Sequence, residues 1–325
     1  MIYDLELKSD ITAQYDGQTV IEHMSDRFTY RPREHWLQMI ASGDVFVDGK
    51  RISADFVLRE GMCLSFVLAD YEEPDLDCDY HKVFENDNLI IVSKPANLPV
   101  SSNHRFFKQN MTALLRKEEN LPDINPIHRL DRETSGLMIY LKKPYEKPRK
   151  LRKDPRLIIL EKNYLAVVRG VVPHEEFSVN VPLKDAGCPP VSYKVVAAAE
   201  GEGKEASTEF KRLAYDDKYS LLLCRLNTGR KHQIRAHLSM SGFPIVGDKL
   251  YSFDGKYFMK RCVEDVLSYE DYEELGATNQ LLHAYSLKLD LPDEGIKTIT
   301  SEHYSHEFAK YLTRFEMTSD FKLKL

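Results

Sequence analysis

A single carboxylate, Asp131, lies between two arginines where a charged loop leads into an apolar run. The loop reads His128-Arg129-Leu130-Asp131-Arg132-Glu133-Thr134-Ser135-Gly136, and Leu137-Met138-Ile139-Tyr140-Leu141 follows it as a predicted buried strand. Flanking cations favour the ionised form of a carboxylate, which is the form that a nucleophile needs. The same cations suit a phosphodiester backbone. For the loop taken alone, a solvated turn whose Asp pairs with an Arg is the simpler interpretation.

A second charged stretch, Arg230-Lys231-His232-Gln233-Ile234-Arg235-Ala236-His237-Leu238, follows a predicted strand and a turn. Because Ile234 and Leu238 are four residues apart on one helical face, we predict a helix here. Arg230 and Arg235 would project from the start of this helix and from its first turns. One short element would therefore present two guanidinium groups.

Two further predicted strands complete the elements that must position these charges. Lys162-Asn163-Tyr164-Leu165-Ala166-Val167-Val168-Arg169-Gly170 is one strand, in which Tyr164 on its own would be a core tyrosine. Leu89-Ile90-Ile91-Val92 is another strand, and Lys94-Pro95 breaks it.

The loop around Asp131 resembles the signature His-Arg-Leu-Asp-Arg-x-Thr-Ser-Gly of the RluA-type pseudouridine synthase family, and it matches that signature at every position. Other motifs of the family are matched, in the family's order, by Lys94-Pro95-Ala96-Asn97, Lys162 to Gly170, Thr228 to Leu238, Gly242 to Tyr251 and Leu282-His283-Ala284. The resemblance therefore covers most of the chain.

The resemblance implies a role for each of several side chains. Asp131 corresponds to the family's catalytic Asp, and Arg235 to the arginine that pairs with it. Tyr164 corresponds to the tyrosine that lies beside the Asp and packs on the target base. Its ring offers a stacking face, and its hydroxyl could accept a proton if its surroundings deprotonated it. Arg129 is our candidate to fill the stack that a flipped base vacates.

The fold implied by the resemblance is α+β, a mixed and mostly antiparallel curved sheet with flanking helices. Distant motifs would meet there in a basic cleft. The implied reaction is isomerisation of uridine to pseudouridine within RNA, in which Asp131 either attacks the sugar carbon or removes a sugar proton. No cofactor and no metal are implied. A metal site at His232 and His237 is not indicated either, because a spacing of five residues diverges on a helix.

Basic side chains near these motifs are the expected contacts to RNA. In the two charged stretches, the predicted RNA-binding residues are His128, Arg129, Arg132, Arg230, His232 and Gln233. Between Lys142 and Arg156, eight basic residues stand against two acids, a local charge of +6 in a protein of net charge −6. From this run we expect contacts to the RNA backbone by Lys147, Arg149, Lys150 and Arg152, while a solvated loop without a partner fits the charge equally well.

Residues 1–70 are predicted to form a small separate module, residues 71–80 an acidic linker, and residues 81–325 the catalytic domain. In the module, two helical patterns precede a hairpin at Asp48-Gly49. This arrangement resembles the ribosomal-protein-S-four-type RNA-binding module, best over Met39 to Lys50. Any small helical hairpin with strands is the alternative.

The composition describes an ordinary soluble protein, with 42% apolar and 30% charged residues. No apolar run reaches the length of a bilayer, and the first residues lack the basic character of a signal peptide. The five cysteines contain no Cys-x-x-Cys pair, which favours a reducing cytoplasm over zinc or disulfides. We expect a cytoplasmic monomer that acts on RNA, with ribosomal RNA slightly favoured over transfer RNA because of the N-terminal module. The segment Ser252 to Gln280 is predicted to be an acidic, aromatic insertion, to which we assign no function.

Two other functions remain open. A catalytically inactive RNA-binding or ribosome-assembly protein could keep the fold, although Asp131, Tyr164 and Arg235 are all present. A carboxylate-based glycoside hydrolase would need a second acid across the scissile bond, and the nearest one, Glu133, is expected to point away.

Overall fold

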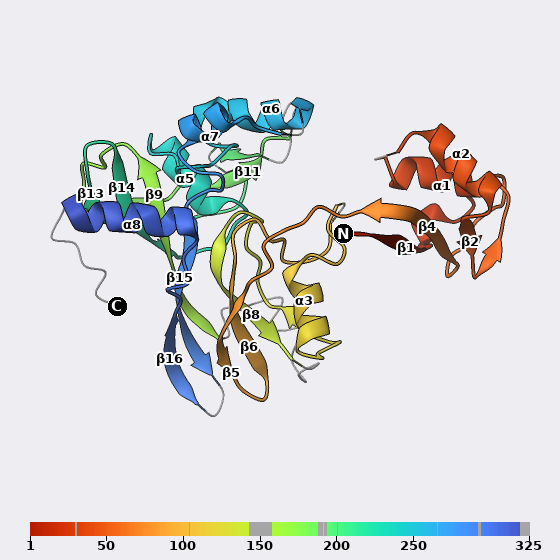
Figure 1. The fold of residues 1–325 in the computed structure, drawn as a ribbon, viewed down its shortest axis with the longest axis horizontal. Helices are drawn as coiled ribbons and strands as arrows, with labels where there is room; N and C mark the ends of the chain where they lie inside the picture. Colours follow the sequence, from red (N-terminus) through yellow and green to blue (C-terminus); the bar gives the residue numbers. More distant parts are fainter. Residues whose placement is uncertain are drawn as a thin grey trace. The chain divides into compact units, whose positions relative to one another are not determined.

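A computed structural model divides the chain into two compact units, Met1–Asp75 and Leu76–Leu325 (Figure 1). The division lies within the segment 71–80 that the sequence predicts to be a linker. The structure describes residues 1–29, 31–103, 105–142, 158–187, 191, 194–199, 201–264, 266–291 and 294–318. The predicted RNA contacts that lie outside the described residues are Lys147, Arg149, Lys150 and Arg152.

The first unit packs two helices on a four-stranded sheet of order β1-β4-β2-β3. Its elements are β1 (Ile2–Asp10), α1 (Val20–Arg27), α2 (Arg33–Ser42), β2 (Val45–Val47), β3 (Lys50–Arg51) and β4 (Cys63–Glu72). A capping box between Thr19 and Glu22 starts α1, and Gly43, at φ +81°, ends α2. Trp36 is fully buried in the core between these layers. The two helices and the hairpin agree with the sequence prediction, whereas the long strands β1 and β4 were not predicted.

The second unit is built on a ten-stranded sheet. Its main path is β10-β13-β14-β9-β15-β8-β6-β5, with β16 paired to β15 and β7 to β8. The strands are β5 (His81–Glu85), β6 (Leu89–Lys94), β7 (Asn125–Pro126), β8 (Ser135–Leu141), β9 (Ile159–Arg169), β10 (Glu176–Val179), β13 (Thr208–Tyr215), β14 (Tyr219–Leu226), β15 (Leu282–Leu291) and β16 (Gly295–Thr300). Among the described residues, the β8–β15 pairing is parallel and the other pairings of this sheet are antiparallel. The predicted α+β, mostly antiparallel fold is confirmed.

Helices and a small two-stranded sheet flank the large sheet. They are α3 (Met111–Glu118), β11 (Leu183–Asp185), β12 (Val195–Ala197), α5 (Gln233–Met240), α6 (Lys256–Glu264), α7 (Tyr269–Leu275) and α8 (His306–Thr318). Figure 1 shows α5, α6 and α7 gathered at one end of the unit. Ser305 Oγ accepts the Phe308 backbone N–H at 3.2 Å, which is the predicted cap of the last helix. Over the part of the chain that is described, no helix combines the length and apolar character needed to cross a membrane.

The middle of the large sheet brings distant motifs together. Strands β6 and β8 are buried along their whole length, which explains their continuous apolar sequences. Ala284 of β15 pairs with Gly136 of β8 on one side and with Tyr164 of β9 on the other. The charged loop that precedes β8 therefore lies near Tyr164, and β14, which leads to α5, is the next strand after β9.

Gly136 is required by the close approach of β8 to β15. Its φ is +101°, and a Cβ at this position would lie 2.3 Å from the backbone oxygen of Ala284. Only glycine combines that backbone conformation with so little space.

We predict that Gly136→Ala destabilises the protein by at least about 3 kcal/mol, because it adds a backbone clash to the cost of a left-handed conformation. Gly242→Ala is the matched control: its φ is +84°, and no atom lies within 4 Å of the added Cβ. The control should cost only about 1 to 2 kcal/mol. Urea unfolding of both variants measures the two free energies, and equal costs would show that β8 and β15 leave room for a side chain.

Candidate active site

The loop that precedes β8 presents the Asp131 carboxylate to Arg235 of α5. Arg235 Nη1 donates to Asp131 Oδ2 at 2.7 Å, so the pairing that the sequence predicts is present. The Thr134 backbone N–H donates to the carbonyl oxygen of Asp131 at 3.1 Å and closes the loop as a tight turn. The Asp131 side chain keeps 29% of its surface exposed, so a substrate can reach it.

Arg235 is shared between two carboxylates. Its Nε and Nη2 donate to Asp248 Oδ2 and Oδ1 at 2.7 and 3.0 Å, while Nη1 serves Asp131. Asp248 is fully buried, and it also accepts the backbone N–H groups of Leu250 and Tyr251 at 2.9 and 3.0 Å. A guanidinium held by two parallel bonds has a fixed direction, so Asp248 determines how Arg235 meets Asp131. Sequence reasoning did not single out Asp248, although it lies in the matched segment from Gly242 to Tyr251.

The charges of these three groups stabilise one another. Burial, the largest single influence, would raise the pKa of Asp131, but the Arg235 charge, the His232 ring and the hydrogen bonds from Arg235 and Gln280 together hold that pKa below its ordinary value. The same balance of burial against Arg235 lowers the pKa of Asp248. Both carboxylates are therefore ionised at neutral pH, and Asp131 is the one that faces outward.

His232 lies on another side of the Asp131 carboxylate. Its Nε2 is 3.7 Å from Asp131 Oδ1, and its Nδ1 is 3.2 Å from the Tyr251 hydroxyl oxygen. Burial, only partly opposed by the Asp131 charge, lowers the pKa of His232 to about 4. The imidazole is therefore neutral at pH 7 and is part of the site itself. The predicted contact of His232 with RNA stays a prediction.

Tyr164 is buried on β9, close enough to Asp131 for the carboxylate charge to act on it. Burial, and then the Asp131 charge, raise the pKa of the Tyr164 hydroxyl. The suggestion that its surroundings deprotonate this phenol is wrong, because a buried site beside an anion disfavours a phenolate. Tyr164 can offer a ring face and donate a hydrogen bond, but it is not a base at neutral pH.

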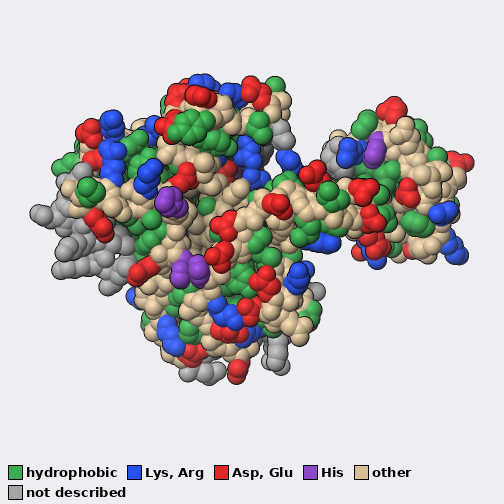
Figure 2. Space-filling view, viewed as in Figure 1, with side chains coloured by type: hydrophobic (Ala, Val, Ile, Leu, Met, Phe, Trp, Pro, Cys, Tyr) green, Lys and Arg blue, Asp and Glu red, His purple; other side chains and the backbone are tan. Residues whose placement is uncertain are grey.

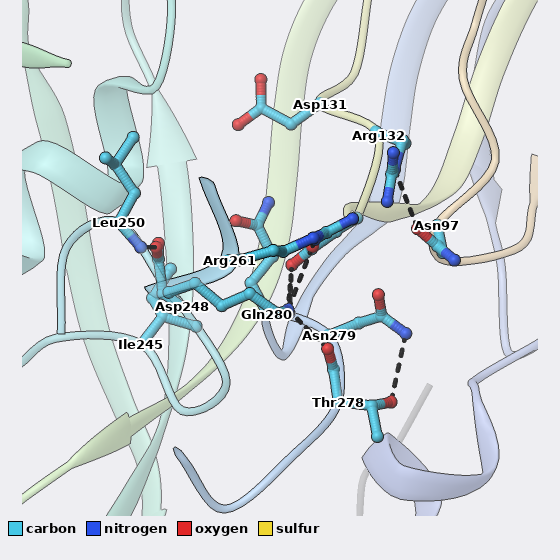
Figure 3. A network of polar contacts seen from close by, with 12 residues as sticks. Asn97, Asp131, Arg132, Ile245, Asp248, Leu250, Arg261, Thr278, Asn279 and Gln280 are labelled. Atoms are coloured by element: carbon cyan, nitrogen blue, oxygen red, sulfur yellow. Dashed lines mark hydrogen bonds and ion pairs between the residues drawn. The ribbon is translucent and has the colours of Figure 1, made fainter. Parts of the chain in front are cut away.

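Other elements hold the side chains that follow Asp131 in the loop (Figure 3). Arg132 Nε donates to Asn97 Oδ1 at 2.8 Å, and its guanidinium carbon lies 5.2 Å from the centre of the Phe106 ring. Gln280 Nε2 donates to the Thr134 hydroxyl oxygen at 2.6 Å. Residues outside the loop thus hold it at Arg132 and at Thr134, which keeps the Asp131 carboxylate in one place.

Glu133 is bound by two cations. Lys249 Nζ lies 3.0 Å from both of its carboxylate oxygens, and Arg261 Nη1 lies 3.3 Å from Oε1. A carboxylate engaged in this way is poorly suited to be the second acid of a glycoside hydrolase. This geometry agrees with the expectation that Glu133 does not work beside Asp131.

Lys94 binds the backbone of the loop that carries Asp131. The sequence places it in a matched motif but predicts no role for it. Its side chain is fully buried, and Nζ donates to the carbonyl oxygens of Pro95, Leu98 and Arg132 at 2.8, 2.8 and 3.0 Å. Burial lowers the pKa of Lys94 to about 7. The backbone just after Asp131 is therefore tied to the end of β6.

Residues 88–240 match the family described as RNA pseudouridylate synthase. Two solved structures share the fold of the second unit. Human RNA Pseudouridylate Synthase Domain Containing 4 has a TM-score of 0.54 and 23% identity, covering 73% of this chain and 93% of that one. Human RNA Pseudouridylate Synthase Domain Containing 1 has a TM-score of 0.54 and 21% identity, covering 71% and 86%.

Relatives with sequence similarity carry related names. RNA pseudouridine synthase 7 of Oryza sativa subsp. japonica is 33% identical over 252 residues, which are 77% of this chain and 64% of that protein. The mitochondrial tRNA pseudouridine(32) synthase of Saccharomyces cerevisiae is 30% identical over 253 residues, which are 78% of this chain and 54% of that protein. The chain thus spans less than two thirds of the length of either relative.

One predicted RNA contact lies inside the second unit. Gln233 is only 3% exposed, and both ends of its amide are used inside the protein. Its Oε1 accepts from the Thr228 hydroxyl and the Arg230 backbone N–H, and its Nε2 donates to Ser207 O and Thr208 Oγ1, at 2.8 to 3.0 Å. The prediction that Gln233 binds RNA is therefore wrong: this side chain holds the turn that starts α5.

His128 also serves the fold. The Ile139 backbone N–H donates to its Nε2 at 3.2 Å, and burial lowers the pKa of His128 to about 3, so the ring is neutral. The predicted contact of His128 with RNA stays a prediction, and it would be made by a neutral ring. Arg129 and Arg230 are exposed, as RNA contacts must be, and Arg230 lines a cavity of about 390 Å³ together with Lys184, Lys204 and Lys231.

We predict that Asp248→Ala destabilises the protein by about 3–5 kcal/mol, because it leaves the buried Arg235 charge without its main partner. Asp248→Asn should cost less, since an amide oxygen can still accept the two backbone N–H groups. Asp290→Ala, at an exposed position of β15, is the control and should change stability by less than about 0.5 kcal/mol. Chemical denaturation measures all three. A cost for Asp248→Ala as small as that of the control would contradict the structural role of Asp248.

Proposed function

We propose that this protein is an RNA pseudouridine synthase that isomerises uridine to pseudouridine in structured RNA. The observation that supports this most strongly is the Asp131 carboxylate, which is ionised by a guanidinium that a buried Asp248 holds in place. The site combines a reachable nucleophile with an aromatic face from Tyr164. The match of residues 88–240 to the RNA pseudouridylate synthase family supports this reaction for the site.

In the proposed reaction, Asp131 acts on the ribose. It either attacks the sugar carbon as the base departs, or removes a sugar proton to form a glycal. In both routes the bond between ring nitrogen one and the sugar breaks, the base turns, and carbon five of the ring joins the sugar. The proton lost from carbon five is balanced by one gained at nitrogen one, so that the overall change is an isomerisation. Arg235 stays protonated and stabilises the carboxylate in its anionic form, and the neutral Tyr164 phenol supports the detached base. Arg129, exposed two residues before Asp131, is proposed to fill the vacated stack.

The substrate is proposed to be RNA, with ribosomal RNA slightly favoured. The support is the first unit, in which two helices precede a hairpin as in the ribosomal-protein-S-four-type module, and for which we propose RNA binding. One relative is named for transfer RNA, so transfer RNA is the alternative substrate. A cytoplasmic monomer, without a cofactor, is part of the same proposal and rests on the sequence alone. Mapping pseudouridines in total RNA from cells with and without the gene would distinguish the two substrates.

Asp131→Asn is expected to abolish pseudouridine formation while RNA affinity stays within a few fold of wild type, because binding is spread over many phosphate contacts. Asp217→Asn, at an exposed residue paired with Arg314, is the control and should keep full activity. The measurement is pseudouridine in a uridine-containing RNA, with free uracil quantified in the same samples. Turnover by Asp131→Asn close to wild type would remove Asp131 from the reaction. Free uracil without pseudouridine would indicate a glycoside hydrolase, and RNA binding without either product would indicate an inactive RNA-binding protein.

Arg235→Ala is expected to move the acid limb of the pH–rate profile to higher pH. In the wild type the charge and hydrogen bond of Arg235 help to lower the pKa of Asp131, and without them burial is opposed only by His232 and Gln280, so that pKa rises. Activity at neutral pH should fall strongly. Arg225→Ala, which removes an exposed guanidinium from β14, should leave the profile unchanged. An acid limb that does not move in a folded Arg235→Ala variant would argue that Arg235 contacts phosphate instead.

A further inference from the structure

The insertion from Ser252 to Gln280 folds into α6 and α7, and these helices are fastened to each other. Tyr257 and Leu275 are fully buried in a small apolar cluster of their own. Lys260 Nζ of α6 lies 2.6 Å from Asp271 Oδ2 of α7. These contacts hold α6, and with it Arg261, the residue after Lys260, in a fixed position.

That residue, Arg261, reaches from α6 to the charged loop. Its Nη1 lies 3.3 Å from Glu133 Oε1, and 32% of its side-chain surface remains exposed. Figure 3 shows its side chain extending beside Arg132, which follows Asp131 in the chain. Burial, and next the Arg261 charge, lower the pKa of Arg132, which confirms that the two guanidinium groups are close. The insertion thus adds a cation at the edge of the site.

Neutralising Glu133 does not require Arg261. Lys249 already lies 3.0 Å from both carboxylate oxygens and is almost fully buried, whereas the single contact of Arg261 is longer and partly exposed. Lys249 and Arg261 therefore bind one carboxylate, and Arg132 is a third cation close enough for the charge of Glu133 to act on it. Like charges gathered without enough counter-charge provide a position for an anion.

Arg132 is also oriented for a ligand. Its Nε is engaged by the neutral amide oxygen of Asn97, and its guanidinium lies over the Phe106 ring. Among the described residues, no acceptor lies within hydrogen-bond distance of its terminal nitrogens. A fixed guanidinium with free donor edges matches the oxygens of a phosphate group. Figure 2 shows Lys and Arg side chains mixed with acidic ones on the face of the molecule that carries α6.

We propose that Arg132 and Arg261 together form a binding subsite for a phosphodiester group of the RNA backbone next to the reacting nucleotide, and that the insertion exists to supply Arg261. Tyr272 of α7 is close enough to both guanidinium groups for their charges to act on the pKa of its hydroxyl. Both helices of the insertion therefore contribute a residue near the subsite. The inference rests on the proposed function, because it takes RNA as the substrate. It assigns the insertion to substrate recognition and not to the chemical step.

The test compares Arg261→Gln with Lys256→Gln in the full-length protein. Both substitutions remove one positive charge from α6, but Lys256 pairs with the exposed Glu274, away from the loop. Binding of a uridine-containing RNA hairpin is measured between about 50 and 200 mM salt, together with single-turnover rates at saturating RNA. Arg261→Lys tests whether charge alone is enough, and thermal unfolding checks that each variant is folded.

Losing one phosphate contact should flatten the slope of log affinity against log salt by about one unit. We expect this for Arg261→Gln, with weaker binding and a nearly unchanged saturated rate, and an intermediate result for Arg261→Lys. Lys256→Gln should resemble the wild type. If the slope of Arg261→Gln equals that of Lys256→Gln, the subsite is wrong and Arg261 only braces Glu133. If Arg261→Gln shows the expected flatter slope but the wild type forms no pseudouridine, the proposed function fails and the subsite stands. If the wild type does not bind RNA at all, both are overturned.

Discussion

The fork of Arg235, divided between a buried and an outward-facing carboxylate, is the interaction on which the site depends. A guanidinium can be buried only when its charge and its donors are satisfied, and Asp248 satisfies two of the three nitrogens. The third nitrogen then binds Asp131 and favours its ionised form in a place where burial alone would raise its pKa. Stability and reactivity are thus coupled through one side chain: the pair that permits burial also orients the group that would react.

The fold supports this interaction by fixing both ends of it. Asp131 lies on a short turn whose following side chains bind Asn97 and Gln280, and the buried Lys94 binds the backbone of that turn from the end of β6. Arg235 lies in the first turn of α5, which follows β14 directly beside the strand that carries Tyr164. Because Gly136 lets β8 approach β15, the parallel pairing brings these parts within contact distance. Arg235 and Tyr164 are therefore carried by a helix and a strand, whereas Asp131, Asp248 and Gln280 lie in loops between regular elements.

Much of this could be predicted from the sequence, where the pattern is local. The continuous apolar run of β8, the cap at Ser305 and the pairing of Asp131 with Arg235 all follow from motifs or periodicity. The role of Asp248 could not, because it depends on complete burial, which a single aspartate in a matched segment does not reveal. Gln233 was wrongly predicted to bind RNA for a related reason. A motif tells which residues occur together, but not whether a polar side chain points to a ligand or to a backbone group of its own chain.

The most direct test of the account is a measurement of the pKa of the Asp131 carboxyl group itself. Carbon-13 NMR of Asp-labelled protein, with Asp131→Asn used to assign the signal, gives this pKa by titration. The account requires a value below the ordinary aspartate pKa of about 3.9 in the wild type, since Arg235 and the other polar neighbours of Asp131 must together outweigh burial. It also requires a clear increase in Asp248→Asn, in which Arg235 loses its fixed direction. A wild-type value at or above the ordinary one, or a value that Asp248→Asn leaves unchanged, would contradict the central role given to the shared guanidinium.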